Sequence, residues 1–322
     1  MDRSVQQTDF DALSYKMAAI SKGYLPSVQQ TATCCYKNYK ETHLEYCNTL
    51  KKLNRRAYSR VHNACRSLLP VMNYGTYLRT ESVDVELHKF LERYGERAQV
   101  VNLGCGSDLR MLMIMDAFEN VRYVDIDFQA SVKLKKDVLI INERLKQQIK
   151  VGDGFSEDRI VTDRYVLVPG DLRNGAEICS LLKEFTSRDV PTIIITECVL
   201  CYLSDDSSKN IIDVVISFYE HGEWISYDPI GGADNNDRFG IIMQANLRES
   251  RRLEMPTLMM YNSKETYASR FPYNSSIKTM WEYYESDISS KEKQRLKTLQ
   301  FLDELEELEI LLSHYIILIT SW

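Results

Sequence analysis

The chain has 322 residues, which is enough for one large α/β domain or for two smaller ones. Its net charge is −6 with a pI near 5.6, and the basic block "KKLNRR" at 51–56 is too short to reverse this balance. An acidic surface argues against binding along nucleic-acid phosphates, so we expect no nucleic-acid partner. The apolar stretches are too short to cross a bilayer and the first residues are polar. We therefore expect a soluble protein without membrane association, located in the cytoplasm and, as a second location, in the nucleus.

The eight cysteines are scattered through the chain, and several of them lie in apolar runs. In a chain without a secretion signal, such cysteines are expected to be reduced and mostly buried. Cys198 and Cys201 have C-x-x-C spacing, but no second pair accompanies them. We therefore predict that both pack in the core, and that the chain has no metal site.

The first 95 residues have the periodicity of helices, with one interruption. Apolar residues spaced by three and four predict a helix over 9–22, and a second, basic helical segment covers 39–69. The Asn-Tyr-Gly sequence within 71–80 is typical of a turn, so we predict a loop there. A further amphipathic helix over 83–95 ends in a capping glycine. We expect this segment, residues 1–95, to form a helical lid.

From residue 96 onward, short apolar runs alternate with helical segments. The predicted strands are 99–104, 121–127, 164–171, 191–197 and 223–228. The predicted helices between them are 110–118, 129–148, 176–185 and 206–219. Such alternation implies right-handed crossovers and a mostly parallel sheet that helices cover on both faces. We therefore predict an α/β fold with a doubly wound sheet.

The last part of the chain departs from this alternation. Apolar residues at helical spacing predict one buried helix face over 301–312, and 314–322 predict a final strand that enters the sheet antiparallel. The residues of that helix face are Phe301, Leu302, Leu305, Leu308 and Leu312. Between 231 and 298 the sequence is irregular and polar, and it is too long for a plain connection. We predict that 231–298 is an insertion over the functional edge of a core that covers 96–322, and that lid and core form one compact catalytic unit.

Glycines or acids end four consecutive predicted strands: Gly104 and Gly106, Asp125 and Asp127, Asp171, and Glu197. In an open parallel sheet, ligands bind beyond the carboxyl ends of the strands, at the point where the strand order reverses. We therefore expect these residues to meet at one ligand site.

The glycine turn "GCGSDL" at 104–109 narrows the class of ligand. A dinucleotide turn needs a third glycine, which is missing here, and Asp108 would repel a pyrophosphate. The G-x-x-x-x-G-K-[ST] phosphate loop is also absent from the sequence. A nucleoside with a cationic or amino-acid group fits better, and S-adenosylmethionine is such a molecule. Asp127 lies 23 positions beyond Gly104, close to the spacing expected of an acid that holds both ribose hydroxyls.

Each of the acids also has a plainer interpretation. We expect at most one of Asp125 and Asp127 to face the ligand and the other to be a solvated strand end. Asp171 has the alternative role of capping the helix that begins near Asn174. Glu197 ends a strand that should be buried, and a buried carboxylate is costly unless it is paired, so we favour a functional role for it.

Six sequence segments together resemble one family, the leucine carboxyl methyltransferases. These segments are "DALSYKMAAISKGYLP", "MNYGTYLRT", "VVNLGCGSDLR", "TECVLCYL", "NDRFGIIMQANL" and "LQFLDELEEL". The resemblance runs from about residue 6 to the final tryptophan, is weakest over 27–50 and 149–163, and points to the fungal form. It implies the class I S-adenosylmethionine-dependent methyltransferase fold, with methylation of the C-terminal leucine of the protein phosphatase 2A catalytic subunit.

The resemblance, and not the spacing, implies roles for three residues at the methionyl end of the cofactor. Lys16 and Arg79 would approach the methionyl carboxylate. Glu197 would lie near the methionyl amino group. Without the resemblance, Lys16 and Arg79 would be interpreted as an ordinary helix-surface lysine and loop arginine.

Four further residues are implied at the nucleoside end. Gly104 would let the backbone reach the cofactor, and Asp127 would hold the ribose. Asp171 and Leu172 would lie on either side of the adenine, with the carboxylate of Asp171 accepting a hydrogen bond from the adenine amino group.

The implied reaction is in-line displacement of the sulfonium methyl by a peptide α-carboxylate, whose pKa of roughly 3.5 leaves it ionised at neutral pH. No general base is required, and we expect the five isolated histidines to be structural. Tyr202 is a candidate substrate contact, with a packed aromatic side chain as the equal alternative. Two other functions stay open: a methyltransferase of this fold acting on a small-molecule carboxylate, and a non-catalytic phosphatase-binding protein. We expect a monomer.

Overall fold

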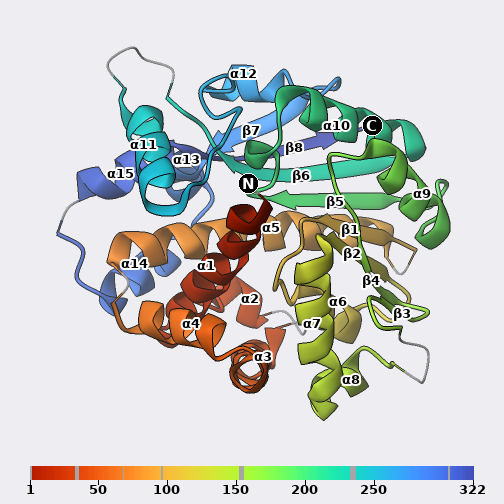
Figure 1. The fold of residues 1–322 in the computed structure, drawn as a ribbon. Helices are drawn as coiled ribbons and strands as arrows, with labels where there is room; N and C mark the ends of the chain where they lie inside the picture. Colours follow the sequence, from red (N-terminus) through yellow and green to blue (C-terminus); the bar gives the residue numbers. More distant parts are fainter. Residues whose placement is uncertain are drawn as a thin grey trace.

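The computed structural model describes residues 2–32, 36–67, 69–95, 97–151, 156–232, 237–303 and 305–322. Eight strands in these ranges form one sheet with the order β3-β4-β2-β1-β5-β6-β8-β7 (Figure 1). Their bounds are β1 Gln99–Leu103, β2 Arg122–Asp127, β3 Ile160–Val161, β4 Tyr165–Pro169, β5 Thr192–Glu197, β6 Gly222–Pro229, β7 Ser275–Thr279 and β8 Tyr315–Ser321. The five strands from β4 to β6 in this order are parallel, whereas β3, β7 and β8 pair antiparallel with their neighbours.

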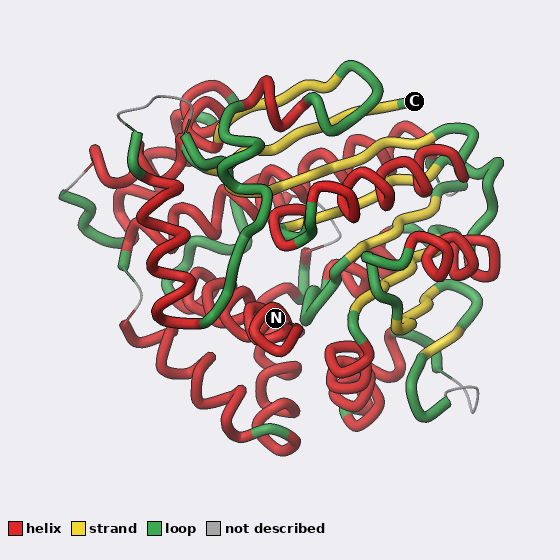
Figure 2. The backbone as a smooth tube through the Cα atoms, turned by 45° about the horizontal axis from the view of Figure 1, so that its top comes forward, coloured by secondary structure: helices red, strands yellow, loops and turns green. Residues whose placement is uncertain are grey.

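Helices cover both faces of this sheet (Figure 2). Successive strand residues supply opposite faces, so that Val100 packs in one apolar core and Val101 in the other. The core with Val101 includes α9 (Gly175–Phe185), α10 (Asp205–Phe218) and α12 (Lys264–Ala268). The core with Val100 includes α1 (Asp2–Ser21), α3 (Tyr39–Leu53), α4 (Arg55–Ser67), α5 (Pro70–Tyr94), α6 (Arg110–Ala117), α7 (Gln129–Ile141), α8 (Glu143–Gln148), α13 (Met280–Ser286), α14 (Ser290–Leu299) and α15 (Leu305–Ser313).

The chain order places the reversal of the sheet at β1. From β1 the chain builds outward through β2 and β4, and it then returns to build β5 and β6 on the other side of β1. The carboxyl ends of β1 and β5 therefore flank the switch point, where open α/β sheets bind ligands. The predicted mostly parallel sheet is confirmed, and so is the antiparallel entry of the last strand.

The predicted loop over 71–80 is wrong, because these residues are part of the continuous helix α5. The residues that suggested a turn make tertiary contacts instead. Asn73 donates from Nδ2 to Gln300 Oε1 at 2.6 Å, and a side chain at Gly75 would lie against Leu311 of α15. The helix begins with Pro70 in its first turn and ends at a glycine with φ +58°, which confirms the predicted C-terminal cap.

The segment 231–298 is more regular than we predicted. Its described residues form α11 (Phe239–Arg251), α12, the edge strand β7, α13 and most of α14. The predicted helix over 129–148 divides at Asn142, whose side chain accepts from Leu145 N at 3.1 Å and caps α8.

The predicted apolar helix face over 301–312 is only partly formed. The helix α15 begins later than expected, at Leu305, and Phe301 ahead of it is 83% exposed. Leu308 and Leu312 are buried as predicted, whereas Leu305 is exposed. None of the helices in the described ranges combines the length and apolar character needed to cross a bilayer.

Candidate active site

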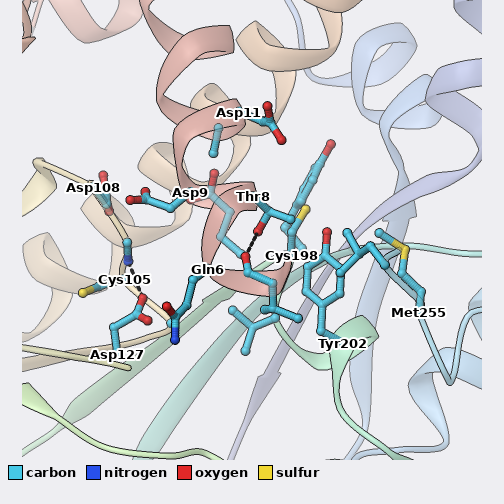
Figure 3. Close-up of a pocket in the computed structure, with 18 of the residues that line it drawn as sticks. Gln6, Thr8, Asp9, Asp11, Cys105, Asp108, Asp127, Cys198, Tyr202 and Met255 are labelled. Atoms are coloured by element: carbon cyan, nitrogen blue, oxygen red, sulfur yellow. Dashed lines mark hydrogen bonds between the residues drawn. The ribbon is translucent and has the colours of Figure 1, made fainter. Parts of the chain in front are cut away.

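A cavity of about 650 Å³ lies at the carboxyl ends of the central strands. Its walls come from α1, α5, the turns after β1, β2, β4 and β5, the segment 243–256, and the start of β8. Figure 3 shows Asp9, Asp108 and Asp127 toward one end, with Cys198, Tyr202 and Met255 toward the other. Of the residues predicted from the sequence, these line the cavity: Lys16, Arg79, Gly104, Asp127, Leu172, Glu197 and Tyr202.

The glycine turn after β1 lies directly against α1 and Val199. Gly104 has φ +72° and Gly106 has φ +45°, a backbone conformation that favours glycine. A Cβ at Gly104 would lie 2.6 Å from a methyl group of Val199, and one at Gly106 would lie 2.5 Å from Asp9 Oδ1. Asp9 of α1 also accepts from Ser107 N at 2.6 Å and from Ser107 Oγ at 2.8 Å. A carboxylate of α1 thus occupies the turn where a dinucleotide-binding protein holds phosphate.

Asp127 at the end of β2 is oriented by two backbone donors. Its Oδ2 accepts from Gly106 N at 2.7 Å, and its Oδ1 accepts from Phe128 N at 2.6 Å. Burial raises the pKa of Asp127 to about 6, although both hydrogen bonds act to lower it. An ionised carboxylate offers about four acceptor positions, so two remain for hydroxyl groups of a ligand.

Asp125 has a different role and does not line the cavity. It is fully buried and bonds to Lys135 Nζ at 2.8 Å and to the Tyr165 hydroxyl at 2.7 Å. The expectation that one of the two acids does not face the ligand is consistent with this arrangement, but the idea of a solvated strand end is wrong. Asp125 is instead a buried ion-pair partner.

Glu197 at the end of β5 is buried among cations. Arg79 of α5 donates from Nε to one carboxylate oxygen, and Arg110 donates from Nη1 to the other at 2.6 Å. Burial alone would raise the pKa of Glu197, but Arg110, Arg79 and Lys16 hold it well below its usual range. The predicted need for a partner is therefore met within the chain, and the carboxylate is ionised at neutral pH.

Lys16 and Asp108 form a second ion pair at the rim of the same site. Lys16 Nζ of α1 lies 3.6 Å from Asp108 Oδ1, and both side chains line the cavity. Burial acts to raise the pKa of Asp108, but Arg110 and Lys16 hold it far below its usual range. The acid that argued against pyrophosphate thus remains negative in the folded chain.

Asp171 lies outside the lining of the cavity, although Gly170, Leu172 and Arg173 are part of it. Its carboxylate pairs with Arg173 at 2.5 Å and is about one-third exposed. The alternative role of Asp171 as a helix cap is wrong, because Asn174 caps α9 by accepting from the Glu177 N–H at 3.2 Å.

The end of the cavity near Cys198 is rich in tyrosines. Tyr15, Tyr202, Tyr227 and Tyr315 line it, and none of their hydroxyls has a hydrogen-bond partner among the described residues. The Tyr227 and Tyr315 rings stack at 5.7 Å, and the Arg79 guanidinium lies 5.4 Å from the Tyr227 ring. Burial raises the pKa values of these phenols, so their hydroxyls keep their protons at neutral pH.

Sequence reasoning missed three parts of this site: Asp9, Arg110, and the tyrosines other than Tyr202. The signal for Asp9 was present, because it lies two helical turns before Lys16 and therefore on the same face of α1. Cys198 and Cys201 are free thiols, half-buried and buried. Within the described residues, no group of three or more histidine, cysteine or acidic side chains is arranged to hold a metal ion.

Comparison with known proteins identifies the family. A sequence model of the leucine carboxyl methyltransferases matches residues 39–216, which is over half of the chain. The chain belongs to the leucine carboxyl methyltransferase family. Within this family, the "Leucine carboxyl methyltransferase 1" of Eremothecium gossypii is 58% identical over 325 residues and covers 100% of both chains. The Kluyveromyces lactis protein of the same name is 46% identical, covering 100% of this chain and 99% of its own. That of Caenorhabditis elegans is 30% identical, covering 98% and 90%.

Solved structures show the same fold. A putative methyltransferase from Thermobifida fusca superposes with a TM-score of 0.52 at 15% identity, covering 85% of this chain and 92% of that one. A DUF574 family protein from Streptomyces avermitilis also gives a TM-score of 0.52, at 12% identity, covering 78% and 85%. The predicted class I methyltransferase fold is confirmed.

Proposed function

We propose that this chain transfers a methyl group from S-adenosylmethionine to the α-carboxylate of the C-terminal leucine of the protein phosphatase 2A catalytic subunit, forming a methyl ester. One observation carries the proposal: a single cavity at the switch point of the sheet contains three groups of residues. They are the glycine turn with Asp127, an ion-paired centre formed by the pairs Lys16–Asp108 and Arg79–Glu197, and an end lined by tyrosines. Membership of the leucine carboxyl methyltransferase family supports the leucine carboxylate as acceptor.

The residues of the cavity suit S-adenosylmethionine in charge and in hydrogen-bonding capacity. Among the described residues, six carboxylates and four cationic side chains line the cavity, so this excess of acid complements a ligand that carries a net charge of about +1. The two free acceptor positions of Asp127 suit the vicinal ribose hydroxyls. Gly104 lines the cavity and carries no side chain, so a ligand can approach its backbone directly.

The ion-paired centre suits the methionyl end, because it offers both signs of charge. Lys16 and Arg79 would hold the carboxylate, and Glu197 would accept from the ammonium group. Leu172 would pack against the adenine. In the structure Asp171 is paired with Arg173, so an adenine amino group that donates to Asp171 would share its carboxylate with that arginine.

When bound, the cofactor supplies an electrophilic methyl group on a positively charged sulfur. The acceptor carboxylate would take this methyl group through one of its oxygens, and the electron pair of the broken C–S bond would stay on the sulfur. The acceptor is already ionised at neutral pH, so the chain needs no general base. Its contribution is to orient the two reactants in line and to exclude water, which strengthens the attraction between carboxylate and sulfonium.

The tyrosine hydroxyls supply the orientation at the acceptor end. Tyr202 and Tyr227 are neutral donors with no partner among the described residues, so each can donate to an acceptor carboxylate. A neutral donor withdraws less charge from the attacking oxygen than a guanidinium would, because it adds no counter-ion. Met243, Leu247 and Met255 form an apolar wall at the same end, which suits a leucine side chain.

A methyl-labelled cofactor tests this proposal with the intact phosphatase catalytic subunit as acceptor. We expect incorporation of label that mild base releases as methanol, and no incorporation once the acceptor lacks its last leucine. Base-stable label would indicate transfer to nitrogen, and labelling without that leucine would refute the proposed acceptor. No labelling at all, with tight binding to the phosphatase, would indicate a binding protein without catalysis.

A further inference from the structure

Arg110 is a buried arginine behind the cavity that sequence reasoning did not single out. It is the first residue of α6, its side chain is only 3% exposed, and it does not line the cavity. A cation at a helix N-terminus opposes the helix dipole, and burial of an arginine costs several kcal/mol unless the charge is paired. Its position therefore depends on specific partners.

Three carboxylates from three parts of the chain surround this guanidinium. Arg110 donates from Nε to Asp84 of α5, and from Nη1 to Asp108 Oδ2 at 2.9 Å and to Glu197 Oε2 at 2.6 Å. Although burial acts to lower the pKa of Arg110, these carboxylates raise it, so the side chain remains a cation. One nitrogen thus joins the two acids that face the cavity.

Each of these two acids contacts a cation of the cavity on its other side. Asp108 Oδ1 lies 3.6 Å from Lys16 Nζ, and the second oxygen of Glu197 accepts from Arg79 Nε. Positive and negative groups therefore alternate in the order Lys16, Asp108, Arg110, Glu197 and Arg79. With the carboxylate behind Arg110, the network contains three cations and three carboxylates, so its charges balance.

The carboxylate behind Arg110 is itself fixed. Asp84 Oδ2 accepts from Gln30 Nε2 at 2.6 Å, and Gln30 Oε1 accepts from Ser27 N at 2.7 Å. Both Asp84 and Gln30 belong to the N-terminal helical segment, whereas Arg110 belongs to the core. The guanidinium is therefore held from the lid side and cannot rotate away from the two cavity acids without losing Asp84.

We infer that Arg110 is a positioning residue that makes the site specific for a zwitterionic amino-acid group. It holds Asp108 and Glu197 side by side as acceptors for an ammonium group, between the two cations that face a carboxylate, Lys16 and Arg79. A zwitterion adds one charge of each sign, so its binding leaves the net charge of this network of cations and carboxylates unchanged. The inference rests on the proposed function, because it takes the methionyl end of S-adenosylmethionine as that zwitterion.

Two ligands that differ in this group test the inference by isothermal titration calorimetry. S-adenosylhomocysteine carries the zwitterion, and 5′-methylthioadenosine has the same nucleoside without it. In Arg110→Lys the single ammonium cannot reproduce the guanidinium fork that reaches three carboxylates. We expect the Kd of S-adenosylhomocysteine to rise at least about tenfold and that of 5′-methylthioadenosine to change less than about twofold. The double variant Arg110→Met/Asp84→Asn, which removes a buried pair together, should show the same selective loss.

Arg122→Lys is the matched control, because Arg122 is another partly buried arginine that bonds to backbone oxygens of Phe185 and Asp163 away from the cavity. We expect it to leave both affinities unchanged. Unchanged binding of S-adenosylhomocysteine to the Arg110 variants would overturn the inference, and so would a parallel loss for both ligands, which indicates a structural role. If the unmodified chain bound neither ligand, the proposed function itself would fail, and the inference with it.

Discussion

Two acids on one strand, Asp125 and Asp127, should separate stability from cofactor binding. Asp127 has two acceptor positions taken by backbone N–H groups and two left for ribose hydroxyls. In Asp127→Asn the amide oxygen keeps one hydroxyl donor and one backbone N–H donor, whereas the amide nitrogen faces the other hydroxyl and the other backbone N–H. Loss of one hydrogen bond to a charged group costs about 1.5–3 kcal/mol, which is roughly a ten- to hundredfold rise in Kd.

Asp125→Asn is the control for that measurement. It leaves the buried Lys135 without a counter-charge, so the free energy of unfolding should fall by about 3–5 kcal/mol. Calorimetric titration with S-adenosylhomocysteine and thermal unfolding of the ligand-free protein give the two quantities. We expect Asp127→Asn to lose affinity with a smaller fall in Tm than Asp125→Asn, since it gives up one hydrogen bond to a backbone N–H but strands no buried charge. We expect Asp125→Asn to lose Tm with little change in affinity. Equal affinity of Asp127→Asn and the unmodified chain would refute the ribose role, as would equal losses of affinity in both variants.

Three further predictions follow from the same site. In the proposed binding mode, ribose hydroxyls would donate to the ionised carboxylate of Asp127, whose pKa burial raises to about 6, so cofactor affinity should be constant above that pH and fall below it. A pH-independent Kd between 5 and 7 would contradict this. Gly104→Ala should destabilise the chain by more than the ~1–2 kcal/mol of left-handed strain, since its Cβ would also overlap a valine. Gly95→Ala has nothing within 4 Å of its Cβ and should show backbone strain without an overlap; denaturant unfolding measures both variants. Tyr202→Phe should raise the KM for the phosphatase roughly tenfold and leave the cofactor Kd unchanged. The control is Tyr219→Phe, because the hydroxyl of Tyr219 bonds to Thr186 and does not line the cavity; it should change neither the KM nor the Kd.

Much of the fold could be predicted because local pattern and tertiary role agree in the central strands. The run 192–197 has three consecutive isoleucines at its centre instead of an apolar–polar alternation, which is typical of a strand buried on both faces. The helix through Asn73 and Gly75 could not be predicted, because contacts with residues more than 200 positions away override the local turn preference. The edge strand β7 was missed for a related reason, since it is short, polar and only half-buried.

The candidate site, like the fold, could be predicted from the sequence only in part. Gly104, Asp127 and Glu197 follow strands directly, so the strand pattern alone places them at one edge of the sheet. Arg110 shows the limit of that reasoning, because its partners Asp84 and Glu197 come from distant elements and nothing in the local sequence records their convergence.

The central claim is that the acceptor is the α-carboxylate of a terminal leucine. Fragmentation mass spectrometry of the methylated phosphatase catalytic subunit tests this claim most directly, because it locates the added methyl group on one residue and one functional group. We predict a single methyl group on the C-terminal leucine, lost on mild alkaline hydrolysis. A methyl group on any side chain, on a backbone nitrogen or on another protein would contradict the account.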